Sequence, residues 1–163
     1  MHRIDKDVSG LLVIAKTEKA YNNLVKQFKE RTIERKYVAL VKGIVQLNEG
    51  IVDLPIGRHP ANRKKMAVTY ASGKNAQTHY KVLKRFRDYT MVELTLKTGR
   101  THQIRVHMAN LGHPILGDAT YGASMGLGRL ALHAKTLGFS HPLTGKRLSF
   151  ELPIPDELKR LCG

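Results

Sequence analysis

Two segments of alternating polar and apolar residues, joined by a short turn, limit most strongly how this chain can fold. Met91–Lys97 reads MVELTLK, with the apolar residues at every second position, and Gln77–Phe86 has a similar character. Alternation with a period of two is typical of a strand that buries one face. Because Asp88 and Tyr89 lie between the two segments, as in a hairpin turn, the pattern predicts an antiparallel β-hairpin.

Further segments extend this pattern towards the N-terminus. Gly10–Lys16 and Ile33–Val41 are predicted strands, because both are short, rich in branched or aromatic side chains and followed by polar or glycine residues. Thr17 is a suitable N-cap for a helix between them. The apolar residues of that helix recur at i, i+3, i+4 and i+7 and are expected to face the core: Tyr21, Leu24, Val25 and Phe28.

The C-terminal half adds a second helix and a last hairpin. Thr101 is predicted to cap a helix that ends at Gly112 and turns Ile104, Met108 and Leu111 towards the core. Residues 130–155 predict two strands joined by the turn SHPLTGK, and a short helix follows over 155–161. Mixed strands and helices with mostly hairpin connections indicate one α+β domain over residues 1–163, with a mixed, mostly antiparallel sheet and flanking helices.

The charge balance points to a polyanionic partner. The chain has 28 Lys and Arg against 13 Asp and Glu, a formal net charge of +15. Repulsion among so many positive charges destabilises the folded state, and binding of a polyanion such as nucleic acid is the natural reason to keep them. A basic surface that is only solvated is the alternative. Leu54–Arg87 holds nine of the basic residues and no acidic one. We interpret its central part, GRHPANRKKM, as an exposed arm or hairpin in which Arg63, Lys64 and Lys65 contact phosphates, with a disordered solvated loop as the alternative.

Other features bear on location and metal binding. The single cysteine, Cys162, allows neither an intrachain disulfide nor a cysteine metal cage and fits a reducing compartment. The apolar runs are too short to span a membrane and the N-terminus is charged, so we expect a cytoplasmic monomer without membrane association. His102 and His107, five residues apart, do not share a helix face, so no metal site is predicted. The glycine-rich segment 122–128 is expected to be a flexible connection.

The most unusual carboxylate is Asp5. It lies in a loop of ionisable residues directly before the apolar run that starts at Gly10, and the flanking cations Arg3 and Lys6 would keep it ionised. An ionised carboxylate among cations suits attack on a sugar carbon, or stabilisation of charge there. Glycoside hydrolysis by the usual route needs two carboxylates, whereas a departing nucleobase needs less protonation. A structural, salt-bridged Asp5 fits the spacing equally well.

Four blocks of the sequence carry a family resemblance. HRIDKDVSGLLVIAK closely resembles the HRLD-x-x-(S/T)-S-G-L-L-V signature of the RluA-type pseudouridine synthases, and GRTHQIRVHMANLGHPILGDATYG resembles their second signature. RKYVALVKG is similar to the segment between them, and LALHAKTLGFSHPLTGKRLSFELPIP to the C-terminal hairpin of the family. The blocks follow the family order from residue 2 to about 155.

This resemblance implies an activity and a set of residues. The family detaches uracil from C1′ of its ribose, turns it and rejoins it through C5, without a metal or cofactor. The resemblance implies that Asp5 is catalytic, that Arg3 helps to displace the target base, that Tyr37 stacks on the uracil and takes part in proton removal, and that Arg105 pairs with Asp5. The implied substrate is structured RNA: ribosomal RNA is expected, with tRNA as the alternative.

Elementary chemistry agrees with those roles. A stacked uridine must be flipped out before C1′ can be reached, and a guanidinium can stack in the space that it leaves. Tyr37 offers an aromatic face and a hydroxyl, and Arg105 would hold Asp5 bidentately. Arg100 either binds phosphate or braces its turn. Whether Asp5 attacks C1′ or removes the 2′ proton to give a glycal stays open at this point.

Family members usually carry several dozen residues before the first signature, and many add an RNA-binding domain of the S4 type. We therefore expect a catalytic domain that lacks its usual N-terminal portion and has no S4 domain. The alternative functions are a non-catalytic RNA-binding module and a nucleoside hydrolase that releases free uracil. Hydrogen-bonded scaffold roles are expected for His102, His107 and His133, and turn or loop hydrogen bonds for Asp7 and Asp118.

Overall fold

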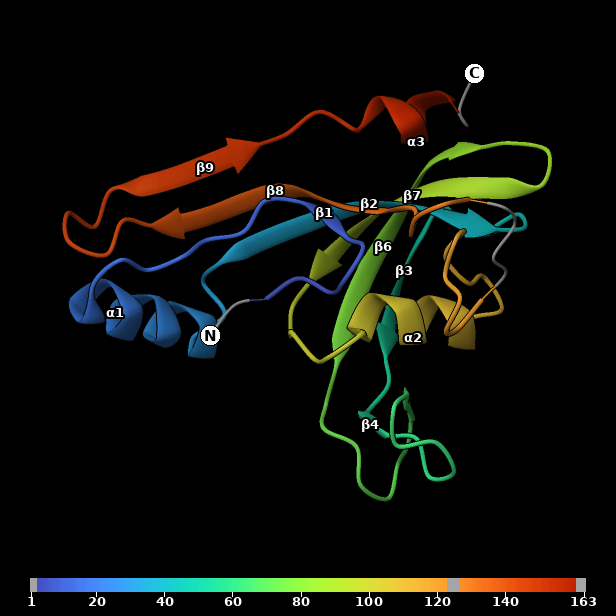
Figure 1. Cartoon of the computed structure of the whole chain (residues 1–163), viewed down its shortest axis with the longest axis horizontal. Helices are drawn as coiled ribbons and strands as arrows, with labels where there is room; N and C mark the ends of the chain where they lie inside the picture. The colour runs from blue at the N-terminus through green and yellow to red at the C-terminus, as the bar shows by residue number, and fades with distance from the viewer. Residues whose placement is uncertain (1–2, 123–126, 161–163) are drawn as a thin grey trace.

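The computed structural model describes residues 3–122 and 127–160, and the expectations placed on His2, Cys162 and most of segment 122–128 lie outside these ranges. A seven-stranded sheet forms the body of the molecule (Figure 1), and only the pairing of β1 with β8 is parallel. The predicted α+β fold with a mixed, mostly antiparallel sheet is therefore confirmed. In spatial order the strands are β1 (Ser9–Gly10), β8 (Leu132–Ser140), β2 (Glu34–Lys42), β7 (Tyr89–Leu96), β6 (Gln77–Arg85) and β3 (Glu49–Asp53), with β9 (Arg147–Glu151) paired to β8.

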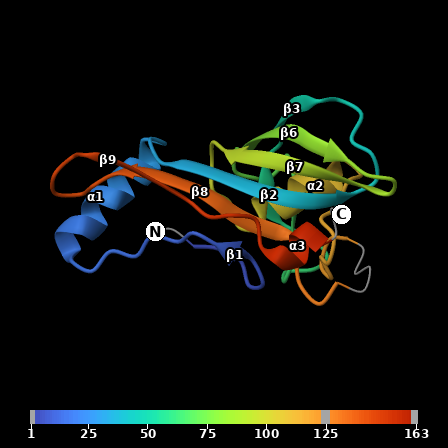
Figure 2. The same ribbon diagram turned by 90° about the horizontal axis from the view of Figure 1, so that it is seen from above.

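The hairpin predicted from the alternating segments is present as β6 and β7, which lie between β2 and the edge strand β3. Along β7, every second residue from Thr90 to Leu96 is buried, as the alternation requires. The helix α2 (Gln103–Asn110) packs its Ile104 and Met108 into the same core. Both α1 (Glu18–Lys29) and α2 lie on one side of the sheet (Figure 1), and from above α1 lies at one end and β3, β6 and β7 at the other (Figure 2).

The strand predicted over Gly10–Lys16 is wrong in its length, because β1 ends at Gly10. One edge of β8 is occupied by β2, and β9 takes the other edge from Thr136 onwards, so residues after Gly10 find no free edge to pair with. Gly10 has a φ of +114°, and a Cβ there would lie 2.2 Å from the Ala134 carbonyl oxygen. Only glycine fits where the chain turns away so close to β8.

Two helix predictions need correction at single residues. Thr17 caps α1 as predicted, accepting a hydrogen bond from the Ala20 N–H, but Tyr21 is 38% exposed and does not face the core. The helix instead turns Gln27 inwards, where its amide bonds to the backbone N–H and C=O of Ser140. In α2 the N-cap is His102, in the left-handed region at φ +56°, rather than Thr101.

The C-terminal end of α2 and the last elements follow the predicted order. Leu111 is the C-cap of α2 and is 39% exposed, so its predicted place in the core is wrong, while Gly112 ends the helix at φ +82°. The predicted last hairpin is β8 with β9, and α3 (Asp156–Arg160) follows it. No helix among the described residues is long and apolar enough to cross a membrane.

The basic segment forms the predicted hairpin, from β4 (Ile56–Arg58) and β5 (Met66–Val68), which projects from the body (Figure 1). Its base packs on α2, since Ile56, Ala76 and Val106 form a small buried cluster there. The tip from 59 to 65 stays at the surface and carries the predicted phosphate-binding cations.

Candidate active site

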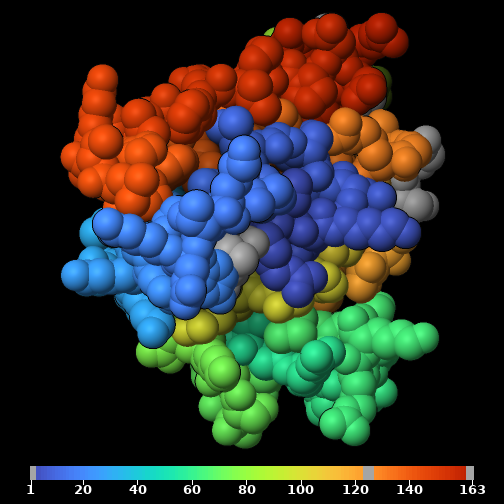
Figure 3. Space-filling view, turned by 60° about the vertical axis from the view of Figure 1, so that its left-hand side comes forward, coloured from blue at the N-terminus to red at the C-terminus, as the bar shows by residue number. Residues whose placement is uncertain are grey.

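A cavity of about 470 Å³ opens between the N-terminal loop, α1, β2 and the turn before α2. Figure 3 shows this face, with the N-terminal segment across its middle and the green hairpin below. Among the lining residues Asp5 is the one carboxylate, and Tyr37 lies in the same wall. Six lining residues are permanently cationic: Arg3, Lys29, Arg31, Arg35, Lys97 and Arg100. The fold thus brings the N-terminal pair Arg3 and Asp5 together with Tyr37 and Arg100, which lie far from that pair in the sequence, on one concave and strongly positive surface.

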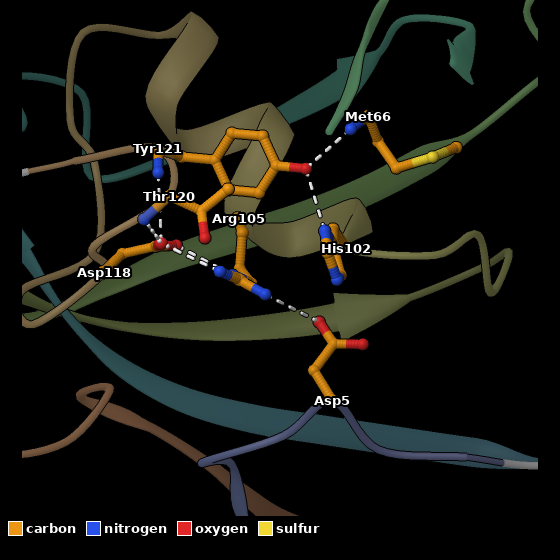
Figure 4. Close-up of polar contacts among 7 residues, drawn as sticks. All are labelled: Asp5, Met66, His102, Arg105, Asp118, Thr120 and Tyr121. Atoms are coloured by element: carbon orange, nitrogen blue, oxygen red, sulfur yellow. Dashed lines mark hydrogen bonds and ion pairs between the residues drawn. The ribbon is translucent and has the colours of Figure 1, made fainter. Parts of the chain in front are cut away.

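Arg105 lies beneath this cavity and connects two carboxylates (Figure 4). Its Nη1 is 3.7 Å from Asp5 Oδ2, while its Nε and Nη2 each donate to Asp118 at 2.8 Å. The expectation that Arg105 holds Asp5 bidentately is therefore wrong: the bidentate partner is Asp118, and Asp5 receives the remaining guanidinium nitrogen. Arg105 is a bridge that fixes its own position on Asp118 and directs positive charge at Asp5.

Asp118 is held from the other side by backbone. Its Oδ1 accepts from the N–H groups of Thr120 and Tyr121 at 2.9 and 3.1 Å, and its side chain has no exposed surface. Burial alone would raise the pKa of this carboxyl, but the hydrogen bonds and charge of Arg105 together with those N–H groups hold the pKa below its usual value. Loop hydrogen bonding was predicted for Asp118 and is confirmed; its ion pair with Arg105 was not predicted.

Tyr121 forms a second support that sequence reasoning missed. Its ring faces the Arg105 guanidinium, with 5.0 Å from Cζ to the ring centroid, and its hydroxyl contacts His102 Nδ1 at 2.8 Å (Figure 4). The same hydroxyl accepts from the Met66 N–H at 2.8 Å, which joins the basic hairpin to the floor of the cavity. Asp118 and Tyr121 both fall in the quoted block GHPILGDATYG, so the family signature was the one signal that could have indicated them.

Tyr37 lies on β2 next to a bulge in the neighbouring strand. Lys36 pairs with Thr136 and Tyr37 with Ala134, so the extra residue is Lys135 of β8. The register of β2 with β7 is regular at Tyr37. Tyr37 is buried, and burial raises the pKa of its hydroxyl although the nearby Arg35 acts in the opposite direction. The free protein therefore presents a neutral phenol at the cavity wall at neutral pH.

The remaining predicted residues fall into two places. Arg3 and Arg100 are exposed at the cavity, and Arg100 Nε also donates to the Asn75 carbonyl at 3.0 Å, which braces its turn. Arg63, Lys64 and Lys65 do not line the cavity and lie at the tip of the β4–β5 hairpin. The site residues named from the sequence thus separate into a cavity group and a hairpin group.

Two of the three histidines expected to have scaffold roles, His107 and His133, make the expected hydrogen-bonded contacts, whereas His102 also lines the cavity. His107 Nδ1 contacts Thr78 Oγ1 and its Nε2 contacts the Leu54 carbonyl, so the buried ring ties α2 to β6 and to the chain before β4. His133 Nδ1 contacts Ser9 Oγ at 2.8 Å, which joins β8 to β1. Within residues 3–122 and 127–160, no three His, Cys, Asp or Glu side chains gather closely enough to hold a metal ion.

Comparisons with known proteins agree with the geometry. The family model described as RNA pseudouridylate synthase matches residues 1–110. A Bacillus subtilis (strain 168) protein named uncharacterized RNA pseudouridine synthase YlyB is 50% identical over 163 residues, which cover 99% of this chain and 54% of that protein. Ribosomal large subunit pseudouridine synthase D of Nitrosomonas europaea is 47% identical over 171 residues, covering 99% of this chain and 49% of its own length.

A solved structure is similar over most of the fold. The human RNA pseudouridylate synthase domain containing 1 superposes with a TM-score of 0.82 at 32% identity, covering 93% of this chain and 67% of that one. The chain spans about half the length of the curated relatives that it matches.

Proposed function

The chain belongs to the RNA pseudouridylate synthase family, and we propose that it isomerises uridine to pseudouridine in structured RNA, with large-subunit ribosomal RNA as the expected substrate. We place the catalytic domain in residues 1–163 and propose that it acts as a cytoplasmic monomer. One observation carries the proposal. Among the described residues that line the cavity, Asp5 is the one carboxylate, and it lies among cationic side chains and beside the aromatic ring of Tyr37.

The proposed reaction needs one carboxylate close to the ribose of the target uridine. The C1′–N1 bond breaks, the uracil turns, the C1′–C5 bond forms, and the hydrogen on C5 leaves as a proton while N1 gains one. Asp5 starts this sequence either by attack on C1′ or by removal of the 2′ proton. Arg105 holds a positive charge next to the Asp5 carboxylate, because its third nitrogen is directed at Asp5 while the other two are fixed on Asp118.

The other cavity residues support base flipping. Tyr37 gives the flipped uracil a face to stack on, and Arg3, exposed beside Asp5, can occupy the space that the base leaves in the RNA. Arg100 at the rim can contact a phosphate while its Nε remains bonded to the Asn75 carbonyl.

Tritium release from RNA labelled at uridine C5 tests the proposal, because formation of the C5 bond must expel that hydrogen. Product analysis of the same reaction separates the alternatives. Pseudouridine supports the proposal, unchanged uridine in bound RNA indicates a non-catalytic RNA-binding module, and free uracil indicates a nucleoside hydrolase. RNA extracted from cells that lack the protein is a suitable substrate, since its target uridines are unmodified.

Tyr37→Phe should retain RNA binding and slow the chemical step by about 10²- to 10⁴-fold, the usual effect of removing a group that transfers a proton. The ring still stacks, while the hydroxyl that burial keeps neutral is lost. Single-turnover kinetics measure the step, and Tyr70→Phe, at a tyrosine that is 78% exposed outside the cavity, is the control. Equal rates for Tyr37→Phe and the unaltered protein would remove the hydroxyl from the mechanism.

Replacement of Arg63, Lys64 and Lys65 by glutamine should weaken RNA binding and reduce its salt dependence. Each lost phosphate contact reduces the magnitude of the slope of log K against log salt by about 0.7 to 0.9, the values for single-stranded and for duplex nucleic acid. Titrations at several salt concentrations measure that slope. The control replaces three exposed lysines away from the cavity and hairpin, Lys19, Lys146 and Lys159, and removes the same charge. The same slope change in both triple variants would show that the hairpin contributes only net charge.

A further inference from the structure

Arg35 is a cation in the cavity without a counter-ion. It lies on β2 two residues before Tyr37, so both side chains emerge on the same face of the sheet, and both line the cavity. Its Nε is buried and has no hydrogen-bond partner among residues 3–122 and 127–160. Among the described residues no carboxylate lies within ion-pair distance of its guanidinium, in contrast to Arg105, which has two such partners.

The surroundings of Arg35 position the guanidinium without neutralising it. The guanidinium carbon lies 5.5 Å from the centroid of the Phe28 ring, and a Cβ at Gly99 would come within 2.6 Å of Nη1. Phe28 thus packs against one part of the group, and the missing side chain at Gly99 leaves room for it. An arginine fork held in this way presents its donors in a fixed plane, which is the arrangement that suits a bidentate oxyanion.

Leaving such a charge unpaired is unfavourable in the free protein. Burial lowers the pKa of Arg35, against the opposing influence of Tyr37, and a guanidinium still keeps its proton at any physiological pH. A desolvated charge without a partner destabilises the folded state, and in most proteins such a residue is paired with an opposite charge or replaced by an apolar residue. An anion that enters the cavity would supply the missing partner and recover that cost on binding.

We infer that Arg35 anchors an anion subsite that takes a backbone phosphate of the RNA next to the flipped uridine. Lys29 and Arg31, at the end of α1, line the same cavity and add positive charge around the subsite. The identification of the anion as an RNA phosphate rests on the proposed function, whereas the oxyanion chemistry rests on the geometry of Arg35 alone. Arg35 thereby differs from Arg63, Lys64 and Lys65, which lie outside the cavity at the tip of the β4–β5 hairpin.

Inorganic phosphate is the first probe, with the melting temperature as readout at constant ionic strength set by chloride. Phosphate should raise the melting temperature of the unaltered protein, because an anion that binds only the folded state stabilises it. Arg35→Gln should lose most of this rise. Arg147→Gln is the matched control: it removes the same charge from β9, outside the cavity, and should keep the rise.

The melting temperatures without phosphate separate binding from a structural role. Since Arg35 is unpaired in the free protein, Arg35→Gln should melt at or above the temperature of the unaltered protein. Arg35→Lys keeps the charge and the apolar stem but not the fork, so it should fold even where the glutamine variant does not, and should lose most of the phosphate response. A response that persists in Arg35→Lys and in any folded Arg35→Gln would overturn the subsite.

RNA binding gives an independent readout. Arg35→Gln should weaken binding about ten- to hundredfold, the range for a lost charge-assisted hydrogen-bonded contact, and reduce the salt slope by about the value for one phosphate. Failure of the subsite and failure of the proposed function remain distinguishable. A protein that releases no tritium but shows an Arg35-dependent phosphate response keeps the subsite. One that releases tritium with an Arg35-independent response keeps the function and loses the subsite.

Discussion

Replacement of Asp5 by asparagine or alanine should abolish pseudouridine formation, lowering turnover by about 10³-fold or more, as expected when a group that forms or breaks bonds is removed. The asparagine variant keeps the shape of the side chain and removes only the charge that Arg105 Nη1 faces at 3.7 Å. RNA affinity should stay within about threefold, because phosphate contacts dominate binding. Tritium release under single-turnover conditions and RNA titration on the same preparation measure the two effects.

A neighbouring carboxylate provides the control. Asp7 lies in the same loop, is exposed and has a φ of +69°, which asparagine tolerates well. Asp7→Asn therefore removes one negative charge two residues away at little conformational cost and should leave turnover unchanged. If the Asp5 variants lose RNA binding together with turnover, or melt well below the unaltered protein, Asp5 is a structural member of the ion-pair network instead.

The sequence predicted the sheet best where a local pattern decided it. Alternation located β6 and β7 because one face of each strand is buried, and the N-cap at Thr17 located α1 because the cap acts within one turn. The predicted strand over Gly10–Lys16 was too long because pairing depends on a free edge, and β9 occupies that edge of β8 from more than a hundred residues away. Local composition holds no information on that competition.

The site shows the same division. The family signature and the local charge identified residues expected to contact the substrate, and of these Asp5, Tyr37 and Arg3 line one cavity. The residues that position them could not be identified in the same way. The side chain of Arg105 can pair with either Asp5 or Asp118, and the choice depends on which carboxylate the fold also holds through the Thr120 and Tyr121 N–H groups. Arg35 became notable only when the structure showed that its buried Nε has no hydrogen-bond partner among the described residues.

Removal of Asp118 should give the largest loss of stability of any change proposed for this chain. Asp118→Ala leaves the buried Arg105 without its bidentate partner and two backbone N–H groups without their acceptor. Breaking one side of a buried ion pair costs about 3–5 kcal/mol of unfolding free energy. Asp118→Asn can still accept from the Thr120 and Tyr121 N–H groups through its amide oxygen, but it removes the charge and the acceptor that Arg105 Nε uses. It should therefore lose less stability than Asp118→Ala. Denaturant unfolding measures both.

The pH dependence of the same variants has a defined sign. The pKa of Asp118 in the folded protein lies below its usual value, despite burial, because of Arg105 and the two N–H groups. A carboxyl of this kind contributes stability at pH values above its unfolded pKa and loses that contribution as pH falls through the folded pKa. The free-energy difference between the unaltered protein and Asp118→Asn should therefore be largest above about pH 5 and shrink below about pH 4. A difference that does not change with pH would mean that the charge of Asp118 contributes nothing.

A double replacement separates the stabilising role of this ion pair from its role towards Asp5. Arg105→Met with Asp118→Leu exchanges a buried pair for apolar side chains, a change that is often neutral or stabilising. It should recover the part of the Asp118→Ala loss that the unpaired guanidinium causes, but not the part from the Thr120 and Tyr121 N–H groups, which still lack their acceptor. It should not recover turnover, because Asp5 then faces no guanidinium. A stable double variant with normal tritium release would show that Arg105 serves the fold alone and that Asp5 needs no fixed cation. If the double variant is stable but releases no tritium, the role of the ion pair is to hold the positive charge of Arg105 next to Asp5.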